Sequence, residues 1–336
     1  MATYKEISGF NIKTLSSDPS NLLEGDIWYN TTSNTLKVAP LVASAWSAAG
    51  VLNTARDNFG SARHGTNTAG LCYGGHTSGP TDPEGDRDVC ESYNGTAWTS
   101  VNVLTAGVTG NGGAGTQAAA LSFAGQGAKT QTDSWDGTNW TTVNSMNTGR
   151  SLAGQGSAGT QGAALAMGGG PPGYLTATEE FDGTNWATSP GSMNTARSDL
   201  AGTGAQTAAV AFGGTQSGVF VVTSTESYDG STWTSQGALN TARRRAAGGG
   251  TLTAGLAFGG LVPGPAATTS TETFDGSSWT AASSMGTGRY FLSGFGLTAT
   301  QSMAMGGLLT GVASNYTNLT EEYNPPGASA KTVTTS

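Results

Sequence analysis

The stretch from Glu226 to Gly260 reads ESYDGSTWTSQGALNTARRRAAGGGTLTAGLAFGG, and near copies of it recur along the 336-residue chain. Its Trp233 has five counterparts along the chain. The six repeat tryptophans are Trp46, Trp98, Trp140, Trp186, Trp233 and Trp279. Consecutive members of this series are 42 to 52 residues apart. A period of about 40 to 50 residues, with one Trp and one Gly-Gly pair per unit, predicts a β-propeller.

Each copy contains the same short motifs in the same order. After the Trp strand comes Asn-Thr-Ala-Arg or a variant, then a Gly-rich strand, an apolar strand ending in two small residues, and a loop of variable length. The repeat arginines are Arg56, Arg150, Arg197, Arg243 and Arg289, with Gly107 at this place in the second copy. An acidic residue then precedes an aromatic by two positions, at Glu91, Asp133, Glu179, Glu226, Glu272 and Glu321. An Asp-Gly or Asn-Gly turn leads into the next Trp and suits a tight hairpin.

This order of motifs predicts four short antiparallel strands per copy. No single copy could bury its own faces, so neighbouring copies must stack. The last copy has Glu321 and Tyr323 but no Trp, whereas Trp46 has no strands of its own before it. We therefore expect Trp46 to supply the outer strand of the last unit, which closes a ring and leaves no exposed sheet edge.

The order of apolar strand, Gly-Gly, acidic-x-aromatic-Asp-Gly and Trp resembles the kelch repeat over about Ala45 to Asn324. The resemblance implies an all-β fold, a six-bladed kelch-like β-propeller with four antiparallel strands per blade, closed by an N-terminal strand. The innermost strands are rich in Gly and Ala, as expected of strands that crowd toward a central axis.

A second resemblance covers residues 25–38, Gly-Asp-Ile-Trp-Tyr-Asn-Thr-Thr-Ser-Asn-Thr-Leu-Lys-Val. It is similar to a segment of tail-fibre and other structural proteins of tailed bacteriophages, especially marine ones, where it stands before Gly-rich, Trp-containing repeats. The resemblance implies a virion protein, made in the host cytoplasm, whose partners are other tail proteins. The residues themselves predict two strands around a polar turn.

These patterns divide the chain into three parts. Residues 1–40 form an N-terminal attachment segment with a short strand pair, residues 41–324 the propeller, and residues 325–336 a Pro/Ser/Thr-rich tail. Cys72 and Cys90 fall in adjacent predicted strands of one copy. That placement would allow a cross-strand disulfide, but two free thiols fit a protein made in the cytosol better.

Composition excludes several function classes. The net charge of −8 and the pI near 4.7 argue against binding to nucleic acid, which needs a basic face. No apolar run approaches 18 residues, so no membrane insertion is expected. The first ten residues lack the basic and apolar regions of a signal peptide, which disfavours secretion through such a signal.

Chemistry-bearing motifs are scarce. The chain has two histidines, His64 and His76, and neither a G-x-S-x-G elbow nor an H-E-x-x-H motif, so we expect neither an enzyme nor a cofactor. The repeated arginines and acidic residues are better explained as charge-assisted pairs inside each unit than as a functional charged ring. In a long loop, Asp82, Glu84, Asp86 and Asp88 stand at alternate positions. Such a loop could bind calcium, but a solvated acidic loop is the favoured interpretation.

The loops after Gly-Gly differ most between copies, whereas those at the opposite end of the blades are short and nearly identical. Repeat proteins usually place function on the variable face. The notable side chains there are His76, Tyr174, Phe220 and Tyr316. Aromatic rings beside Asn, Thr and Asp suit a saccharide, so we expect host-surface glycan or receptor binding through this face.

Three alternatives stay open. The four aromatic residues could merely pack the loops, and the propeller could then be a purely architectural virion module. A secreted bacterial lectin-like propeller is the non-viral alternative. The sequence is also compatible with a homo-oligomer.

Overall fold

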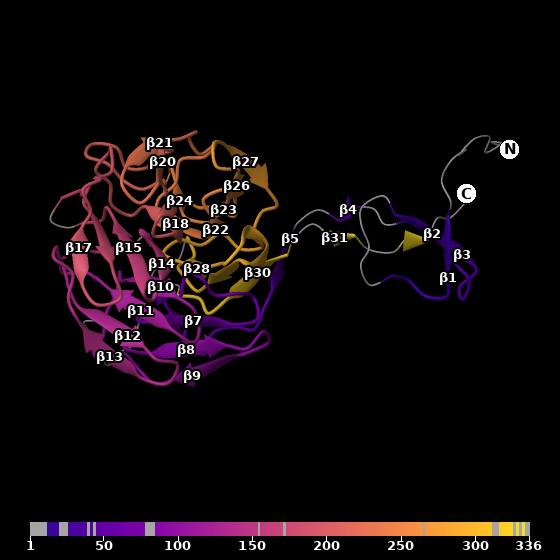
Figure 1. Ribbon diagram of the computed structural model, residues 1–336, viewed down its shortest axis with the longest axis horizontal. Helices are drawn as coiled ribbons and strands as arrows, with labels where there is room; N and C mark the ends of the chain where they lie inside the picture. Colours follow the sequence, from indigo (N-terminus) through magenta and orange to yellow (C-terminus); the bar gives the residue numbers. More distant parts are fainter. Residues whose placement is uncertain are drawn as a thin grey trace. The chain divides into compact units, whose positions relative to one another are not determined.

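The computed structural model describes residues 12–19, 26–38, 41–42, 45–77, 85–153, 155–170, 173–264, 266–310, 316–324, 327–328 and 331–332. The chain divides into two compact units (Figure 1). The first, called here the repeat domain, is Ala45–Asn324, and the second, the terminal unit, combines Met1–Ser44 with Pro325–Ser336. Apart from one 3-10 turn, η1 (Ala299–Gln301), all regular structure in the described residues is β-strand.

The repeat domain contains six four-stranded antiparallel sheets within the described residues, in a β-propeller-like all-β fold. We name them sheets I to VI in chain order. Sheet I is β6 (Gly60–Ser61), β7 (Gly70–Tyr73), β8 (Cys90–Tyr93) and β9 (Trp98–Val101). Sheet II is β10 (Gly112–Gly115), β11 (Ala120–Phe123), β12 (Thr132–Trp135) and β13 (Trp140–Val143). Sheet III is β14 (Ser157–Thr160), β15 (Ala163–Met167), β16 (Thr178–Phe181) and β17 (Trp186–Thr188).

The remaining sheets follow the same plan. Sheet IV is β18 (Ala201–Ala205), β19 (Ala208–Phe212), β20 (Thr225–Tyr228) and β21 (Trp233–Ser235). Sheet V is β22 (Ala247–Thr251), β23 (Ala254–Phe258), β26 (Thr271–Phe274) and β27 (Trp279–Ala282), with a small hairpin of β24 (Leu261–Val262) and β25 (Ala266–Ala267) inserted. Sheet VI is β28 (Ser293–Phe295), β29 (Met303–Met305), β30 (Thr320–Asn324) and β5 (Ala45–Ala48).

Sheet VI therefore takes its fourth strand from the beginning of the repeat domain. Strand β5 is antiparallel to β30, and Trp46 lies opposite Tyr323. The same Trp–aromatic register occurs in the other sheets, for example between Trp233 and Tyr228. The predicted pairing of Trp46 with the last copy is present.

Burial rises from the rim of the repeat domain to its centre. The fourth strands begin with a buried Trp and continue exposed, as in β21, whereas the first two strands of most sheets are buried along nearly their whole length. Figure 1 shows first strands such as β10, β14 and β18 near the centre of the domain and fourth strands such as β13 and β17 at its rim. A Cβ atom on Gly294 of β28 would come within 2.6 Å of the Phe258 ring, so this position on an inner strand leaves no room for a larger residue.

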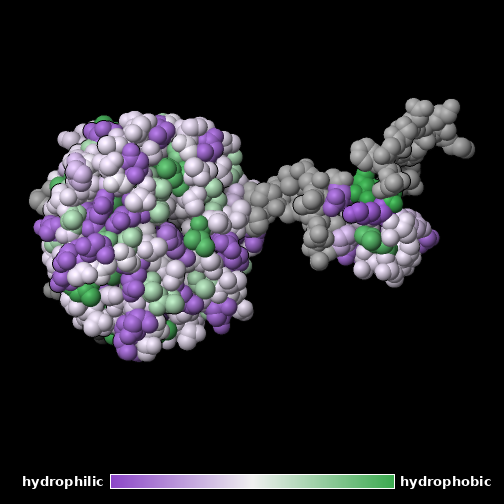
Figure 2. All heavy atoms as spheres, in the orientation of Figure 1, coloured by the Kyte–Doolittle hydropathy of each residue, from purple (hydrophilic) through white to green (hydrophobic). Residues whose placement is uncertain are grey.

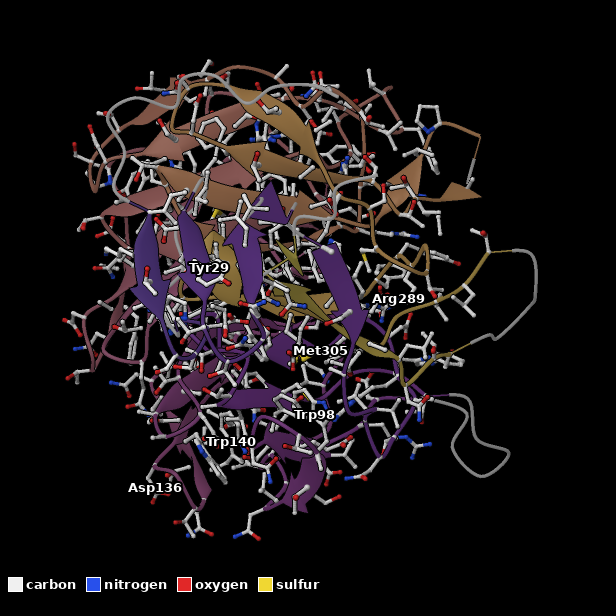
Figure 3. All side chains as sticks on the ribbon, turned by 90° about the vertical axis from the view of Figure 1, so that its right-hand side faces the viewer. Tyr29, Trp98, Asp136, Trp140, Arg289 and Met305 are labelled. Atoms are coloured by element: carbon white, nitrogen blue, oxygen red, sulfur yellow. The ribbon has the colours of Figure 1, made fainter. Side chains whose placement is uncertain are left out.

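Within the described residues, the hydrophobic core of the repeat domain consists of six clusters, each filling the space between two sheets. Five of them join consecutive sheets from I to VI. The sixth joins sheet VI to sheet I, through Phe295, Met303 and Met305 on one side and Phe59 and Trp98 on the other. Figure 3 shows Trp98 and Trp140 on sheets I and II, and Met305 on sheet VI. Stacked neighbours thus bury the faces that no sheet could bury alone.

The terminal unit has its own small sheet, in the order β1 (Lys13–Leu15), β2 (Ile27–Asn30), β3 (Thr35–Val38) and β32 (Lys331–Thr332). The predicted strand pair is the antiparallel hairpin β2–β3, while β1 is parallel to β2. Strands β4 (Leu41–Val42) and β31 (Gly327–Ala328) also pair. The segment 325–336, which the sequence suggested as a separate tail, instead supplies β31 and β32 to the unit built on residues 1–44.

Buried Trp28 explains part of the 25–38 motif. Its indole Nε1 donates to Asp18 Oδ1 at 3.1 Å, and Asn30 Nδ2 donates to the same oxygen at 2.7 Å. Asn30 Oδ1 accepts the backbone N–H groups of Thr32 and Ser33, which closes the polar turn. These residues of the motif therefore stabilise the fold of the terminal unit.

Candidate functional site

The repeat arginines are structural. Each is fully buried and forms an ion pair with the acidic residue of its own copy, as the repeat pattern predicts. The pairs are Arg56–Glu91, Arg150–Glu179, Arg197–Glu226, Arg243–Glu272 and Arg289–Glu321. Each Nη1 also donates to two backbone carbonyls, those of Gly213 and Ser224 in the case of Arg197. A buried charge needs this many partners because it has lost its hydration.

The Asn-Thr-Ala-Arg string is explained by the same carboxylates. Glu91 accepts the backbone N–H groups of Asn53 and Thr54, and Asn53 Nδ2 donates to the carbonyl of Trp98. The third copy repeats both contacts, from Asn147 to Glu179 and to the carbonyl of Trp186. The string leads into the first strand of a copy and is hydrogen-bonded to the third and fourth strands. Its side chains and backbone therefore have a structural role.

Sheet II departs from this scheme, as Gly107 predicts. Among the residues that the structure describes, its Asp133 has no arginine partner, and it accepts hydrogen bonds instead from Thr105, Gln131 and Thr142. A cavity of about 10 Å³ lies beside Gly107 and Asp133, where the other sheets hold a guanidinium. That volume corresponds to about one water molecule.

One end of the sheets carries both the linkers that follow the arginines and the loops that follow Gly-Gly. The two are joined by backbone bridges, Ser151 with Gly170, Ser198 with Thr215, Arg244 with Leu261 and Tyr290 with Leu308. We call this end the variable face. Because the bridges recur in several copies, they hold chemically different side chains at equivalent places.

A series of left-handed residues runs along this face. Asn58, Asp199, Arg245 and Phe291 each stand two positions after a repeat arginine and have φ between 53° and 55°. Their backbones are joined between neighbouring copies: Arg245 N donates to Asp199 O, Phe291 N to Arg245 O, and Asn58 N to Phe291 O, at 2.8–3.0 Å. Non-glycine residues avoid this conformation, so its repetition shows that the inter-sheet hydrogen bonds impose it.

A cavity of about 460 Å³ opens among these residues. It is lined by Asn58, Gln126, Ser151, Ala153, Gly170, Gly173, Tyr174, Ser198, Asp199, Arg245 and Phe291. The lining combines two aromatic rings, hydroxyl and amide groups, and one carboxylate beside one guanidinium. Its volume lies in the range of about 300–1,000 Å³ typical of small-molecule sites.

The charged part of the lining is Asp199 and Arg245, and Arg244 lies behind it as a second partner of Asp199. Both arginines donate to Asp199 Oδ2, Arg244 from Nη1 at 3.1 Å and Arg245 from Nε at 2.8 Å. Each guanidinium also lies over a ring, Arg244 at 3.6 Å from the centroid of Phe220 and Arg245 at 4.0 Å from that of Phe291. Burial and the neighbouring Arg245 lower the pKa of Arg244. Two cations share one carboxylate, which leaves a local excess of positive charge on an acidic protein.

A second polar group lies on the same face. Tyr316 Oη and His76 Nδ1 are 2.6 Å apart, and the same His76 nitrogen is 3.8 Å from Asp57 Oδ1. Burial raises the pKa of Asp57 to about 7, against an opposing contribution from Arg245. Burial and the carboxylate of Asp57 raise the pKa of Tyr316.

The structure separates the four side chains predicted for ligand binding. His76 and Tyr316 contact each other, Phe220 supports Arg244, and of the four only Tyr174 lines the cavity. Sequence reasoning missed Asp199, Arg245 and Phe291. A signal existed, because the position two residues after the repeat arginine holds Asn, Asp, Arg and Phe in four copies whose surroundings are nearly identical.

The inner strands are bridged by two polar side chains, Arg63 and Gln155. Arg63 donates to Gln155 and to the carbonyls of Gly202 and Gly294, and Gln155 Nε2 donates to the carbonyl of Phe59. These partners belong to four different sheets or their linkers, so the bonds form where the first strands converge. Burial lowers the pKa of Arg63 to about 10.

Other predicted chemistry finds little structural support. Asp82 and Glu84 lie outside the described residues, Asp86 pairs with Lys129 at 3.0 Å, and no group of three metal-ligating side chains occurs in the part of the chain that is described. Cys72 and Cys90 are buried free thiols, as favoured, and burial raises the pKa of both. None of the described segments forms a helix that could span a membrane.

Comparisons with known proteins add no assignment. No family model matches the chain, and no curated protein matches its sequence.

Proposed function

We propose that the repeat domain is a closed six-bladed kelch-like propeller in which sheets I to VI are the blades. Contacts between the last and first sheets support closure. Asn58 N donates to Phe291 O, and Tyr93 Oη donates to Glu322 Oε1 at 2.8 Å. The hydrophobic cluster of Phe59, Phe295 and Met305 joins the same two sheets.

The function proposed for this propeller is saccharide binding by a non-enzymatic virion protein of a tailed phage, in a tail fibre or a tail-associated position. The cavity on the variable face is the observation that carries the binding part. Tyr174 and Phe291 offer ring faces for the apolar side of a sugar, and Ser151, Ser198 and Gln126 offer partners for its hydroxyls. The virion part rests on the resemblance of residues 25–38.

Surface character agrees with a polar ligand. The side of the repeat domain seen in Figure 2 is mostly hydrophilic or neutral, with small, separate hydrophobic patches. Proteins that bind through apolar contacts tend to present one large contiguous patch.

The polar cluster of Tyr316, His76 and Asp57 adds hydrogen-bonding side chains to the variable face. The tyrosine and histidine also satisfy each other by their hydrogen bond.

Binding of the purified chain to a panel of bacterial capsular polysaccharides and lipopolysaccharides tests the proposal. Tyr174→Ala should weaken binding about tenfold or more with an unchanged melting transition, because its side chain is 38% exposed and lines the cavity. The control Val103→Ala changes a side chain that is 49% exposed and outside the cavity, and should bind like the wild type.

The architectural alternative predicts a different outcome. If the variable face seats the propeller on another virion protein, Tyr174→Ala should impair particle assembly. Absence of binding across the panel, together with a covered variable face in electron micrographs of the particle, would refute the saccharide proposal.

A further inference from the structure

The cavity holds one side chain whose hydrogen-bonding capacity is only partly used. Arg245 donates from Nε to Asp199 and rests its guanidinium face on Phe291. Neither Nη1 nor Nη2 has a hydrogen-bond partner among the described residues, and the side chain is 26% exposed in the cavity lining. The free edge of a guanidinium is a planar fork that matches the two oxygens of a carboxylate.

This fork is held in place before any ligand arrives. The left-handed backbone of Arg245, with φ of 55°, is fixed by hydrogen bonds to both neighbouring linkers. Asp199 holds one edge of the guanidinium and Phe291 holds its face. Fixing the side chain in advance reduces the entropy lost on binding.

The surrounding charges leave this fork available to an anion. Asp199 is the one carboxylate in the cavity lining and is shared by two arginines. The other acidic group facing Arg245, Asp57, is buried against His76 and Tyr316.

We infer that the cavity selects acidic saccharides, with the carboxylate of a uronic or related sugar acid bound to the Nη1 and Nη2 groups of Arg245. The inference rests on the proposed saccharide function and narrows its ligand class. The sugar ring then lies against Tyr174 and Phe291, and its hydroxyls reach Ser151, Ser198 and Gln126. No covalent step is involved.

Paired probes test the inference in the full chain. Each uronate-containing polysaccharide of a panel is compared with its carboxyl-reduced form, in which the same sugar carries a primary alcohol. The wild type should bind the acidic form about 10- to 100-fold more tightly, the range expected for charge-assisted hydrogen bonds. Arg245→Gln should abolish this preference, and Arg245→Lys should retain part of it.

Lys129→Gln is the matched control. It removes one positive charge from a half-buried ion pair outside the cavity lining, so it alters net charge equally and should keep the preference. Equal loss in Lys129→Gln and Arg245→Gln would mean that only net charge matters, and the inference would fail. Equal binding of acidic and reduced forms by the wild type would overturn the inference while leaving the saccharide function intact. Binding of neither form across the panel would overturn both.

Discussion

Each repeat guanidinium has two kinds of partner, a carboxylate and the carbonyl ends of two backbone segments. For Arg197 these are Glu226 at 2.9 Å and the carbonyls of Gly213 and Ser224. The carbonyls alone cannot balance the charge. Losing the carboxylate would leave a buried cation without a counterion. Sheet II has Gly107 in place of the repeat arginine, so the same change there leaves no unpaired guanidinium.

Glu226→Gln should therefore lower the free energy of unfolding by about 3–5 kcal/mol, the cost of breaking a buried ion pair. The position-matched control is Asp133→Asn in sheet II, whose partners are neutral. Its loss should be smaller, about 1–2 kcal/mol, because the amide oxygen of Asn still accepts hydrogen bonds and no arginine loses its counterion. Chemical denaturation measures both, and similar losses would contradict a counterion role for Glu226.

Asp57 gives the stability of the protein a pH dependence of unusual sign. Its pKa is raised to about 7 from an ordinary value of 3.8, chiefly by burial. Between these two pH values the folded state binds more protons at this site than the unfolded state, so stability falls as pH rises. A shift of this size corresponds to roughly 4 kcal/mol over the whole window.

Asp57→Asn removes this titration. The difference in unfolding free energy, variant minus wild type, should increase as pH rises from about 4 to about 7 and level off above. Thermal or chemical unfolding at several pH values measures it. A difference that does not change with pH would show that Asp57 titrates alike in the folded and unfolded chain.

At the scale of elements, strand β5 is, within the described residues, the one strand of the six four-stranded sheets of the repeat domain that pairs solely with a strand from the other end of that domain. It lies beside β30, almost 280 residues later in the chain, with Trp46 packed between Tyr323 and Phe258 at ring-centroid distances of 5.2 and 4.9 Å. Without it, β30 would become a sheet edge with unpaired backbone groups.

Deletion of residues 1–50 should therefore cause aggregation or loss of cooperative unfolding. Deletion of residues 1–44 removes the N-terminal part of the terminal unit but keeps β5, and should leave a cooperative transition for the repeat domain. Size-exclusion chromatography and calorimetry compare the two. A soluble 1–50 deletion with an unchanged transition would show that β5 is dispensable.

The elements and the pairing of β5 could be predicted because six copies in register reveal each turn, Trp and ion pair several times. The cavity could not, since it depends on which linker residues meet. A left-handed conformation, which their residue types do not predict, is shared by Asn58, Asp199, Arg245 and Phe291. Gln155 reaches its partners from an inserted stretch of the third copy that has no parallel in the others. The repetition therefore predicted the features that the copies share, whereas the candidate site is formed by residues that differ between copies.

For the whole molecule, the contacts between successive sheets are alike except at two of six places. Between sheets I and II, the third strand of sheet I begins with Cys90 instead of a threonine, and the buried Trp140 Nε1 has no hydrogen-bond partner among the described residues. The other exception is the junction of sheets VI and I. In the other four contacts the Trp indole Nε1 donates at 2.9 Å to the threonine that begins the third strand of the preceding sheet. These bonds are Trp186–Thr132, Trp233–Thr178, Trp279–Thr225 and Trp46–Thr271. The equivalent groups of sheets I and VI, Trp98 Nε1 and Thr320 Oγ1, are both buried and make no hydrogen bond within the described residues.

The junction of sheets VI and I, where the proposed ring would close, therefore has two buried polar groups that cost stability. Thr320→Val removes one of them with little change in shape and should leave the protein as stable or up to about 1 kcal/mol more stable. The matched change Thr178→Val breaks an intact Trp–Thr bond and should cost about 1–2 kcal/mol, because the buried indole of Trp233 loses its acceptor.

Hydrogen exchange adds a spatial readout, since strands β30 and β6 beside this junction should exchange faster than β18 and β22, and Thr320→Val should slow them. If both valine variants lose similar stability, Thr320 has a hydrogen-bond partner in solution and the junction is no weaker than the rest.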